Sequence, residues 1–293
     1  MHTLFCIALI ASVGCVVVAL TDLVEEHNAK CPKGELSYSK MDVVSDIPKD
    51  QWPAFSPILI PDNFVEDDIS KIVGNKVAPD SIDWREKGHV THVKYQGTCG
   101  DCWIFASVAA LEALYKRKSG KLEVFSEQNL RDCVPRCPCY GGSPPIAFDF
   151  VAIQQGGLLD PEKYYPRSET ISKCKFDKPD ADNTTVVSHI YFEGEDKLKE
   201  VVGTVGPVVV YISANRTKFI ESHGEVVYDP DYKKSDPVDH GILVVGYGTD
   251  EEGGDYWLLK NSWGIHKGDK GYFRLARNRD GHLGIGTFCF LPV

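Results

Sequence analysis

The chain has 293 residues, of which 43% are hydrophobic and 25% charged, and its formal net charge is -10 at neutral pH. That length and composition allow a sizeable buried core that two compact lobes could share. The acidic balance argues against a nucleic-acid partner, because the sequence offers no basic stripe to neutralise phosphates. Ten cysteines are too sparse for a small disulfide scaffold, so their positions must indicate their roles.

Residues 4–20 form a nearly uninterrupted apolar run with small residues such as Ala19 available for cleavage. This pattern predicts a signal peptide over residues 1–20. A membrane anchor is the alternative, but the run is at the lower edge of spanning length and no basic flank follows it, so we expect no stable membrane anchor. Entry into the secretory pathway agrees with two glycosylation sequons, which begin at Asn183 and Asn215.

Residues 21–77 are polar, contain several prolines and show only short hydrophobic patches such as 55–60. This composition does not predict an independent core. Periodic and glycine-punctuated segments begin at residues 78–84, so we place a processing or domain boundary near Val77.

The stretch 96–105 leads into a run of helix formers that reaches Tyr115, which places Cys102 at or near the start of a helix. The partial positive charge of a helix N-terminus stabilises a thiolate and so favours a nucleophilic sulfur. The alternative is structural, either a buried thiol or half of a disulfide.

Helices are predicted in the rest of this half and strands in the next. Ser126 is a plausible N-cap for a short helix, and a further helix is expected from Pro145 to about Gln155, after a cysteine-rich loop. Strand signals separated by Gly, Asp and Pro follow at 208–213, 225–228, 241–247, 256–261 and 271–276. The pattern predicts an α+β protein.

Two of these strands carry residues that a nucleophilic Cys102 requires. His240 stands at the head of one apolar strand, and Asn261 ends another beside Trp263. A thiol needs a base to take its proton, and an imidazole base needs a partner that fixes its tautomer. His240 and Asn261 fit these two roles, and Trp263 could shield the pair from water.

At this point the chain resembles the papain-family (cathepsin-type) cysteine proteases, with a body similar to cathepsin L. The resemblance runs from about residue 78 to the end and rests on motifs in the family's order: Asp83-Trp84-Arg85, Cys99-Gly100-Asp101-Cys102-Trp103, Ser126-Glu127-Gln128-Asn129-Leu130, Gly141-Gly142, His240-Gly241 and Asn261-Ser262-Trp263-Gly264. It implies a two-lobed peptidase domain at 78–293, with a helical lobe at about 86–187, a β-barrel-like lobe at about 188–293 and the active-site cleft between them.

The resemblance also implies the roles of single residues. Cys102 would be the nucleophile and His240 the acid/base, paired as thiolate and imidazolium, with Asn261 orienting the imidazole. Gln96 would donate its side-chain amide to the oxyanion beside the backbone N–H of Cys102; taken alone, it reads equally as a surface residue. Gly142 would let the substrate backbone approach, although a simple turn also explains a Gly-Gly pair.

Substrate contacts are expected from Pro144, Val238, Asp239, Trp263 and Phe288. The pocket for the second residue on the acyl side of the scissile bond would be lined by Pro144, Val238 and Gly286, with Phe288 near its floor, which favours aliphatic side chains. The sequence lacks the insertions by which exopeptidase relatives block the cleft, so an endopeptidase is expected.

Family spacing suggests the disulfides Cys99–Cys139 and Cys133–Cys174. The usual third bridge is missing, since Lys233 and Leu283 occupy its places, and Cys137 and Cys289 stay unassigned. A metal site at Cys133, Cys137 and Cys139 lacks zinc-ribbon spacing, so no metal or cofactor is expected. Asp101 stands where the family usually has Ser, and its carboxylate could oppose ionisation of the neighbouring thiol.

Residues 21–77 would then be a pro-peptide, shorter than in cathepsin-L-like relatives, that blocks the cleft until removed. Cys31 could mask Cys102 in the zymogen or stay free or pair elsewhere. The expected partners are protein or peptide substrates, the chain's own pro-peptide and cystatin-like inhibitors, in a lysosomal or extracellular location. The alternative function is a catalytically impaired homologue that binds peptides or a partner without turnover.

Overall fold

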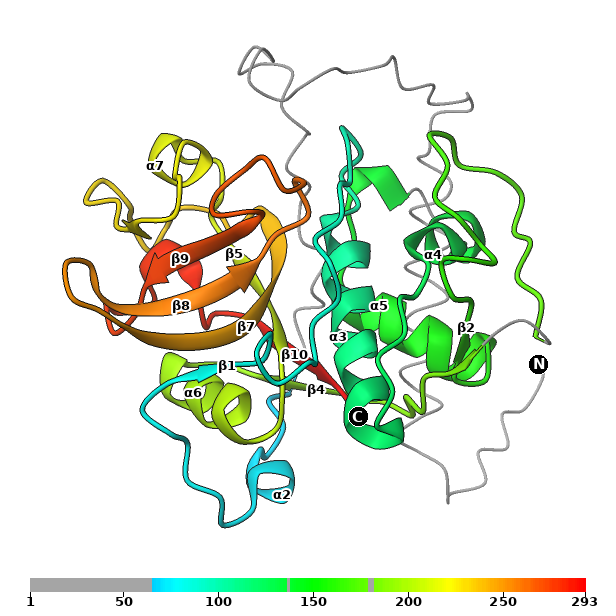
Figure 1. The fold of residues 1–293 in the computed structure, drawn as a ribbon, viewed down its shortest axis with the longest axis horizontal. Coiled ribbons are helices and arrows are strands. Elements are labelled where there is room, and N and C mark those ends of the chain that lie inside the picture. Colours follow the sequence, from blue (N-terminus) through cyan, green and yellow to red (C-terminus); the bar gives the residue numbers. More distant parts are fainter. Residues whose placement is uncertain (1–64, 136–137, 179–181) are drawn as a thin grey trace, which may run out of the picture. The chain divides into compact units, whose positions relative to one another are not determined.

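The computed structural model describes residues 65–135, 138–178 and 182–293 (Figure 1). The expected signal peptide, the hydrophobic patch at 55–60, Cys31 and Cys137 lie outside these ranges. Within them, no helix combines the length and the apolar character that crossing a bilayer demands.

The helices of the first half gather around α3 (Cys102–Ser119), which appears in teal in Figure 1. The others are α4 (Glu127–Cys133), η3 (Pro138–Tyr140), α5 (Pro144–Asp149) and its continuation η4 (Phe150–Gln154). A small antiparallel two-stranded sheet, β2 (Leu158–Leu159) with β3 (Asp182–Asn183), accompanies them. As expected, Cys102 begins a helix, and the Ser126 hydroxyl accepts the Asn129 N–H as the N-cap of α4.

Seven strands of the second half, in the order β4-β10-β5-β7-β8-β9-β6, form one eight-stranded sheet with β1 of the first half, which pairs with β7. Its strands are β1 (Ile82–Asp83), β4 (His189–Phe192), β5 (Val208–Ile212), β6 (Val226–Val227), β7 (His240–Asp250), β8 (Gly254–Lys260), β9 (Tyr272–Ala276) and β10 (Cys289–Pro292). The shorter elements are α2 (Ser70–Val73), α6 (Glu195–Thr204), α7 (Thr217–Ile220) and η5 (His282–Gly284). The α+β class is confirmed. The sheet is not closed into a barrel, because β4 and β6 end the strand order without pairing with each other in the described ranges.

Both faces of the sheet are buried, which explains why β5 and β7 read as continuous apolar runs. Val208 and Val210 pack with α6 in one core, whereas Val209 and Tyr211 point to the other face and pack with α3 in a second core. This alternation follows from the two-residue period of a strand. The second core joins the helices to the sheet and thereby fixes the start of α3 relative to the head of β7.

Two disulfides staple the helical half, Cys99–Cys139 and Cys133–Cys174, as the family spacing suggests. Because Cys133 and Cys139 are both bridged, neither has a thiolate to offer a metal. Cys102 and Cys289 are buried free thiols.

Residues 65–77 lie on the sheet rather than in a core of their own. Ile69 and Val73 of this segment are buried in the core beside α6, and the Asp67 N–H donates to the Tyr191 carbonyl oxygen of β4 at 2.8 Å. Val77 is 89% exposed. An exposed Val77 suits the expected processing boundary, which stays a prediction.

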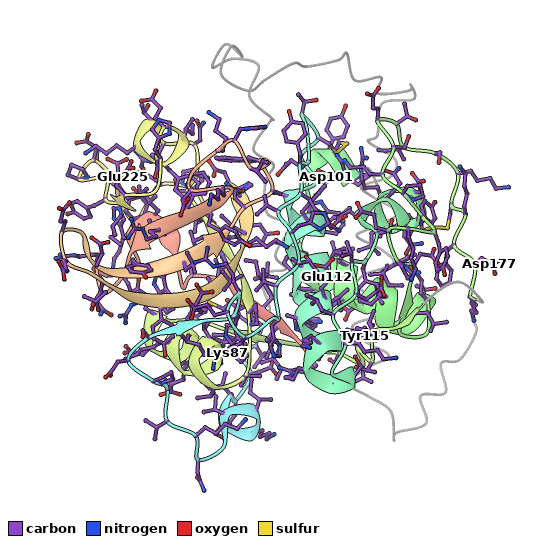
Figure 2. All side chains as sticks on the ribbon, in the orientation of Figure 1. Lys87, Asp101, Glu112, Tyr115, Asp177 and Glu225 are labelled. Atoms are coloured by element: carbon purple, nitrogen blue, oxygen red, sulfur yellow. A yellow bond between two sulfur atoms is a disulfide. The ribbon has the colours of Figure 1, made fainter. Side chains whose placement is uncertain are left out.

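Figure 2 labels charged side chains at the surface and in the interior. Asp177 and Glu225 lie at the periphery, whereas Asp101 and Glu112 lie beside α3 in the interior. Asp101 and Glu112 are 0% and 1% exposed. Buried carboxylates of this kind require compensating partners, which both of them have near the candidate site.

Candidate active site

The Cys102 sulfur lies at the first residue of α3, against the head of β7. The backbone N–H of Gly241 donates to the sulfur at 3.3 Å, and the backbone N–H of Trp103 also hydrogen-bonds to it. A side chain on residue 241 would press against α3, since a Cβ there would come within 3.3 Å of the Trp103 Cα atom. Glycine at this position therefore permits the close approach of strand and helix.

His240, Asn261 and Ser262 form a chain of hydrogen bonds behind the sulfur. The Oδ1 atom of Asn261 accepts the Ser262 backbone N–H at 2.8 Å and lies 2.8 Å from the Nε2 atom of His240. Because Oδ1 is an acceptor, Nε2 must carry the proton of this bond. The Nδ1 atom is left as the ring nitrogen that can take a proton from a thiol.

Trp263 packs against the same imidazole. The two ring centroids are 4.8 Å apart, and the indole is itself held edge-on by Phe219 and Phe273. His240 is 2% exposed and Asn261 3% exposed. The shielding expected from Trp263 agrees with this packing.

Gln96 is fixed from three sides. Its Nε2 atom donates to the Cys99 carbonyl oxygen at 2.7 Å, its Oε1 atom accepts the Ser262 hydroxyl at 2.5 Å, and its backbone N–H donates to the Ser262 carbonyl oxygen at 2.8 Å. These contacts exclude the reading of Gln96 as a surface residue. Nε2 carries two protons, and Cys99 uses one of them.

Ser262 belongs to the motif at 261–264, but the motif alone does not predict a role for this residue. The structure shows that its N–H, hydroxyl and carbonyl groups hold both Asn261 and Gln96. The position of Ser262 directly after Asn261, at the end of an apolar strand, is the one sequence feature that could have indicated this supporting role.

Burial favours the neutral form of both reactive groups. Desolvation raises the pKa of the Cys102 thiol to about 12, although the N–H groups of Gly241 and Trp103 oppose the change. Desolvation likewise lowers the pKa of His240 to about 4, opposed by the hydrogen bond to Asn261. A proton that passes from sulfur to imidazole adds no net charge to the buried site, so the two groups can ionise together more readily than either can alone.

Gly142 has a packing role that the sequence did not reveal. A Cβ atom at this position would lie 2.4 Å from the indole ring of Trp103, and the Gly142 carbonyl oxygen accepts the Tyr211 hydroxyl at 2.8 Å. The indole in turn donates to the Pro138 carbonyl oxygen at 3.1 Å. Glycine is thus required here by a close contact with the residue after Cys102.

Gly142→Ala is expected to lower the free energy of unfolding by about 1–3 kcal/mol, because the added methyl group overpacks the contact with Trp103. Thermal unfolding measures the change. Gly206→Ala is the matched control, since a Cβ there meets only Arg117, at 3.7 Å. Equal stability of the two variants would contradict the close contact.

The residues expected to contact substrate lie on several elements. Pro144 is the buried first residue of α5, and Val238 and Phe288 are partly buried against the core that contains α3. The Asp239 carboxylate accepts the Ala214 N–H at 2.7 Å, so it also holds the turn before β7. The Gly286 carbonyl oxygen accepts the Gly194 N–H at the start of α6, and its place in the substrate pocket stays a prediction.

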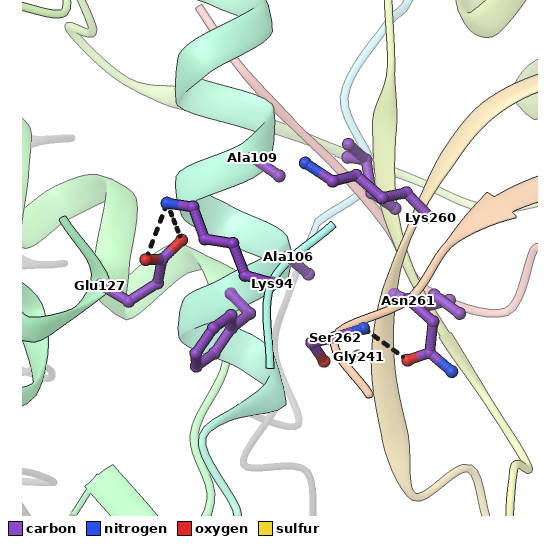
Figure 3. Close-up of a pocket in the computed structure, with 11 residues that line it drawn as sticks. Lys94, Ala106, Ala109, Glu127, Gly241, Lys260, Asn261 and Ser262 are labelled. Carbon is purple, nitrogen blue, oxygen red and sulfur yellow. Dashed lines mark hydrogen bonds and ion pairs between the residues drawn. The ribbon is translucent and has the colours of Figure 1, made fainter. Parts of the chain in front are cut away.

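A small cavity of about 20 Å³ lies behind Asn261, between α3 and the ends of β7 and β8 (Figure 3). Lys94 enters it, and its Nζ atom lies 2.8 Å from Glu127 and 3.4 Å from Glu112. The two carboxylates raise the pKa of Lys94 despite burial, so the amine stays charged. This buried ion group joins α3, α4 and the segment that leads to Gln96.

The two sequons differ in what the structure shows. Asn215 is exposed, as an acceptor must be. Asn183 lies in β3, and its side chain lies outside the described part of the chain. Glycosylation at both positions stays a prediction.

A buried thiol that contacts the backbone of Gly241, the residue after His240, and an imidazole that an amide orients are the groups that acyl transfer through sulfur requires. Comparison with known proteins identifies the family: the model of the papain family cysteine proteases matches residues 78–293. The chain therefore belongs to the papain family and is a papain-like cysteine peptidase, a hydrolase.

The relatives agree with this assignment. The chain is 41% identical to cathepsin S from Bos taurus, in an alignment that covers 91% of this chain and 81% of that protein. It is 44% identical to a cathepsin L-like peptidase from Aedes aegypti, in an alignment that covers 75% of this chain and 65% of that protein. Digestive procathepsin L2 from the Tenebrio molitor larval midgut superposes with a TM-score of 0.76 at 33% identity, covering 95% of this chain and 91% of that one. Bromelain from Ananas comosus, solved with the E64 inhibitor, superposes with a TM-score of 0.66 at 32% identity, covering 73% of this chain and 99% of that one.

Proposed function

We propose that the chain is a cysteine endopeptidase in which Cys102 attacks the peptide carbonyl and His240 moves the proton. The observation that supports this most strongly is the pair of contacts around the site: the Gly241 N–H on the sulfur at 3.3 Å and the Asn261 Oδ1 atom on His240 at 2.8 Å. Together they fix the positions of the sulfur and the ring.

In the proposed reaction His240 takes the thiol proton at Nδ1 while the sulfur forms a bond to the carbonyl carbon. Gln96 and the backbone N–H of Cys102 would stabilise the developing oxyanion. The imidazolium then gives its proton to the leaving amine as the C–N bond breaks. Water, deprotonated by His240, hydrolyses the thioester and restores the thiol.

Maturation and location are part of the same proposal. Residues 1–20 would direct secretion, 21–77 would act as a pro-peptide that is removed near Val77, and the mature enzyme would act on protein or peptide substrates in a lysosome or outside the cell. Cystatin-like proteins are expected inhibitors. The apolar character of Val238 and Phe288 supports a preference for aliphatic side chains in the adjoining substrate position.

Stoichiometric labelling by an epoxide such as E64 tests the assignment. After maturation at acidic pH, one equivalent is expected to abolish peptide hydrolysis and to add one inhibitor mass to the peptide that contains Cys102. Cys102→Ser should neither hydrolyse peptides nor take up label, while Cys289→Ser, which removes the other free thiol of the described residues, should do both. A correctly folded wild-type protein without label or hydrolysis would favour the impaired homologue.

A further inference from the structure

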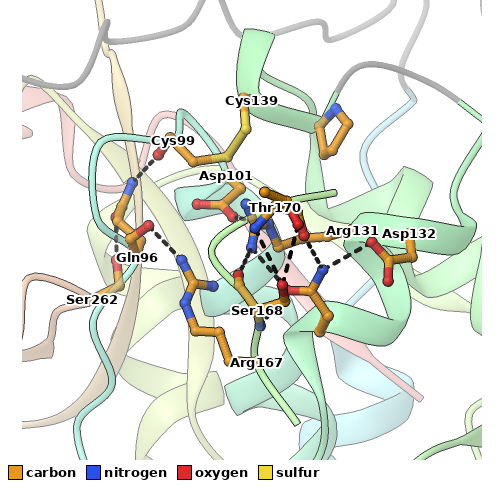
Figure 4. Close-up of polar contacts among 12 residues, drawn as sticks. Gln96, Cys99, Asp101, Arg131, Asp132, Cys139, Arg167, Ser168, Thr170 and Ser262 are labelled. Carbon is orange, nitrogen blue, oxygen red and sulfur yellow. Dashed lines mark hydrogen bonds and ion pairs between the residues drawn. A yellow bond between two sulfur atoms is a disulfide. The ribbon is translucent and has the colours of Figure 1, made fainter. Parts of the chain in front are cut away.

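The residue before the nucleophile, Asp101, has a partner that no motif indicated. Its carboxylate is completely buried, and its Oδ2 atom lies 2.9 Å from the Nε atom of Arg131, which is 1% exposed. Figure 4 shows Asp101 and Arg131 facing each other between α3 and α4. A buried ion pair of this kind is held in place by its surroundings rather than by solvent.

Asp101 also belongs to the backbone that presents the thiol. Its carbonyl oxygen accepts the N–H groups of Ile104 and Phe105 at 2.8 and 3.2 Å, so it closes the first turn of α3. A movement of Asp101 therefore moves the sulfur of the next residue.

Arg131 is braced at its far end. Its Nη1 atom donates to the Gln128 Oε1 atom at 2.9 Å and to the Ser168 carbonyl oxygen at 3.0 Å. Gln128 donates in turn to the Thr170 carbonyl oxygen at 3.0 Å. The guanidinium is thus held by α4 and by the segment after β2.

A second arginine holds the other end of the same loop. Arg167 donates to the Gln96 carbonyl oxygen at 2.5 Å, and its guanidinium lies 4.8 Å from the centre of the Phe105 ring. The loop from Gln96 to Cys102 is therefore anchored by one guanidinium at each end, as Figure 4 shows.

We propose that Arg131 is a positioning residue for the proposed nucleophile: its ion pair with Asp101 fixes the start of α3 and cancels the negative charge beside the Cys102 sulfur. The proposal rests on the assignment of Cys102 as nucleophile. It also answers the concern that an aspartate at this position would suppress the thiolate, because the carboxylate and its partner together carry no net charge.

The charged groups around Asp101 and Arg131 determine how the loss of the Arg131 cation would affect the Cys102 thiolate. Arg131 and Glu127 act on Asp101 from α4, and Arg167 acts on it from the segment after β2. Burial raises the pKa of Asp101 to about 7, opposed by the two arginines. Asp101 and Asp239 both disfavour the Cys102 thiolate. Loss of the Arg131 cation makes the surroundings of the sulfur more negative by one charge in either protonation state of Asp101.

The experiment compares the acid limb of the kcat/KM–pH profile, which reports ionisation of the free enzyme, in four proteins normalised by active-site titration. Arg131→Met is expected to move that limb upward by about one pH unit, a tenfold fall in kcat/KM on the limb, because a neighbouring cation is lost. Asp101→Asn is expected to move it downward wherever Asp101 is ionised. Where Asp101 is ionised, the double variant should return close to wild type, and where Asp101 is protonated, the double variant should match Arg131→Met. Arg131→Lys, which keeps the charge, should keep the wild-type limb.

A merely structural role for Arg131 would reduce the titratable fraction and leave the limb in place. If the wild type titrates and is active but Arg131→Met and Arg131→Lys both share its acid limb, the inference is overturned while the proposed function stands. A wild type that neither titrates nor hydrolyses peptides would instead refute the proposed function. Should Arg131→Met fail to fold, Asp101→Asn and the double variant differ by the same single cation and give the same comparison.

Discussion

His240→Ala is expected to lower kcat/KM by about 10³–10⁴-fold, because the buried Cys102 thiol then has no base to take its proton. Burial raises the pKa of that thiol to about 12, so hardly any thiolate would form near neutral pH without the imidazole. Peptide hydrolysis across a pH series measures the effect. Folding should survive, since the side chain makes one hydrogen bond in the site, to Asn261.

Asn261→Ala is the matched comparison. Because the hydrogen bond that His240 donates to Asn261 raises the pKa of His240 against desolvation, its loss should lower that pKa further and move the acid limb of kcat/KM to lower pH. The fall in rate should be smaller than for His240→Ala, since the base itself stays. An acid limb unchanged in Asn261→Ala would contradict the orienting role.

Lys94→Met is expected to lower the free energy of unfolding by about 3–5 kcal/mol, because it removes the cation that contacts the buried carboxylates of Glu112 and Glu127. Denaturant unfolding at neutral pH measures this loss. Lys121→Met removes an exposed lysine and should change stability by less than about 0.5 kcal/mol.

The loss should also depend on pH. In the folded variant, burial without the Lys94 cation holds the pKa of the Glu127 carboxyl group above the unfolded value, so the folded state binds more protons than the unfolded state as pH falls. The variant should therefore regain part of its stability between neutral pH and pH 5. Adding Glu127→Gln to Lys94→Met should also recover part of the lost free energy of unfolding at neutral pH, because the uncompensated carboxylate is removed. Equal stability of Lys94→Met and wild type would show that the ion group contributes little.

Local sequence patterns were sufficient where a short-range rule applied. The start of α3 at Cys102 and the Ser126 cap followed from helix propensity and capping, and β5 and β7 followed from long apolar runs. The elements that these patterns missed include β4, α6 and β10. Their short apolar stretches acquire their form only by packing on β5 and its neighbours, as the pairing of β10 with both β4 and β5 shows.

The sequence by itself determined the class of chemistry, because a thiol at a helix start and His240 and Asn261 at strand ends are separate local signals that need no tertiary information. Only the tertiary structure decided what surrounds them. Arg131 lies 30 positions from Asp101 along the chain, and no local pattern marks it as the partner of that carboxylate. Long-range packing determines which buried charges meet, and a buried charge acquires its role from the partner that compensates it.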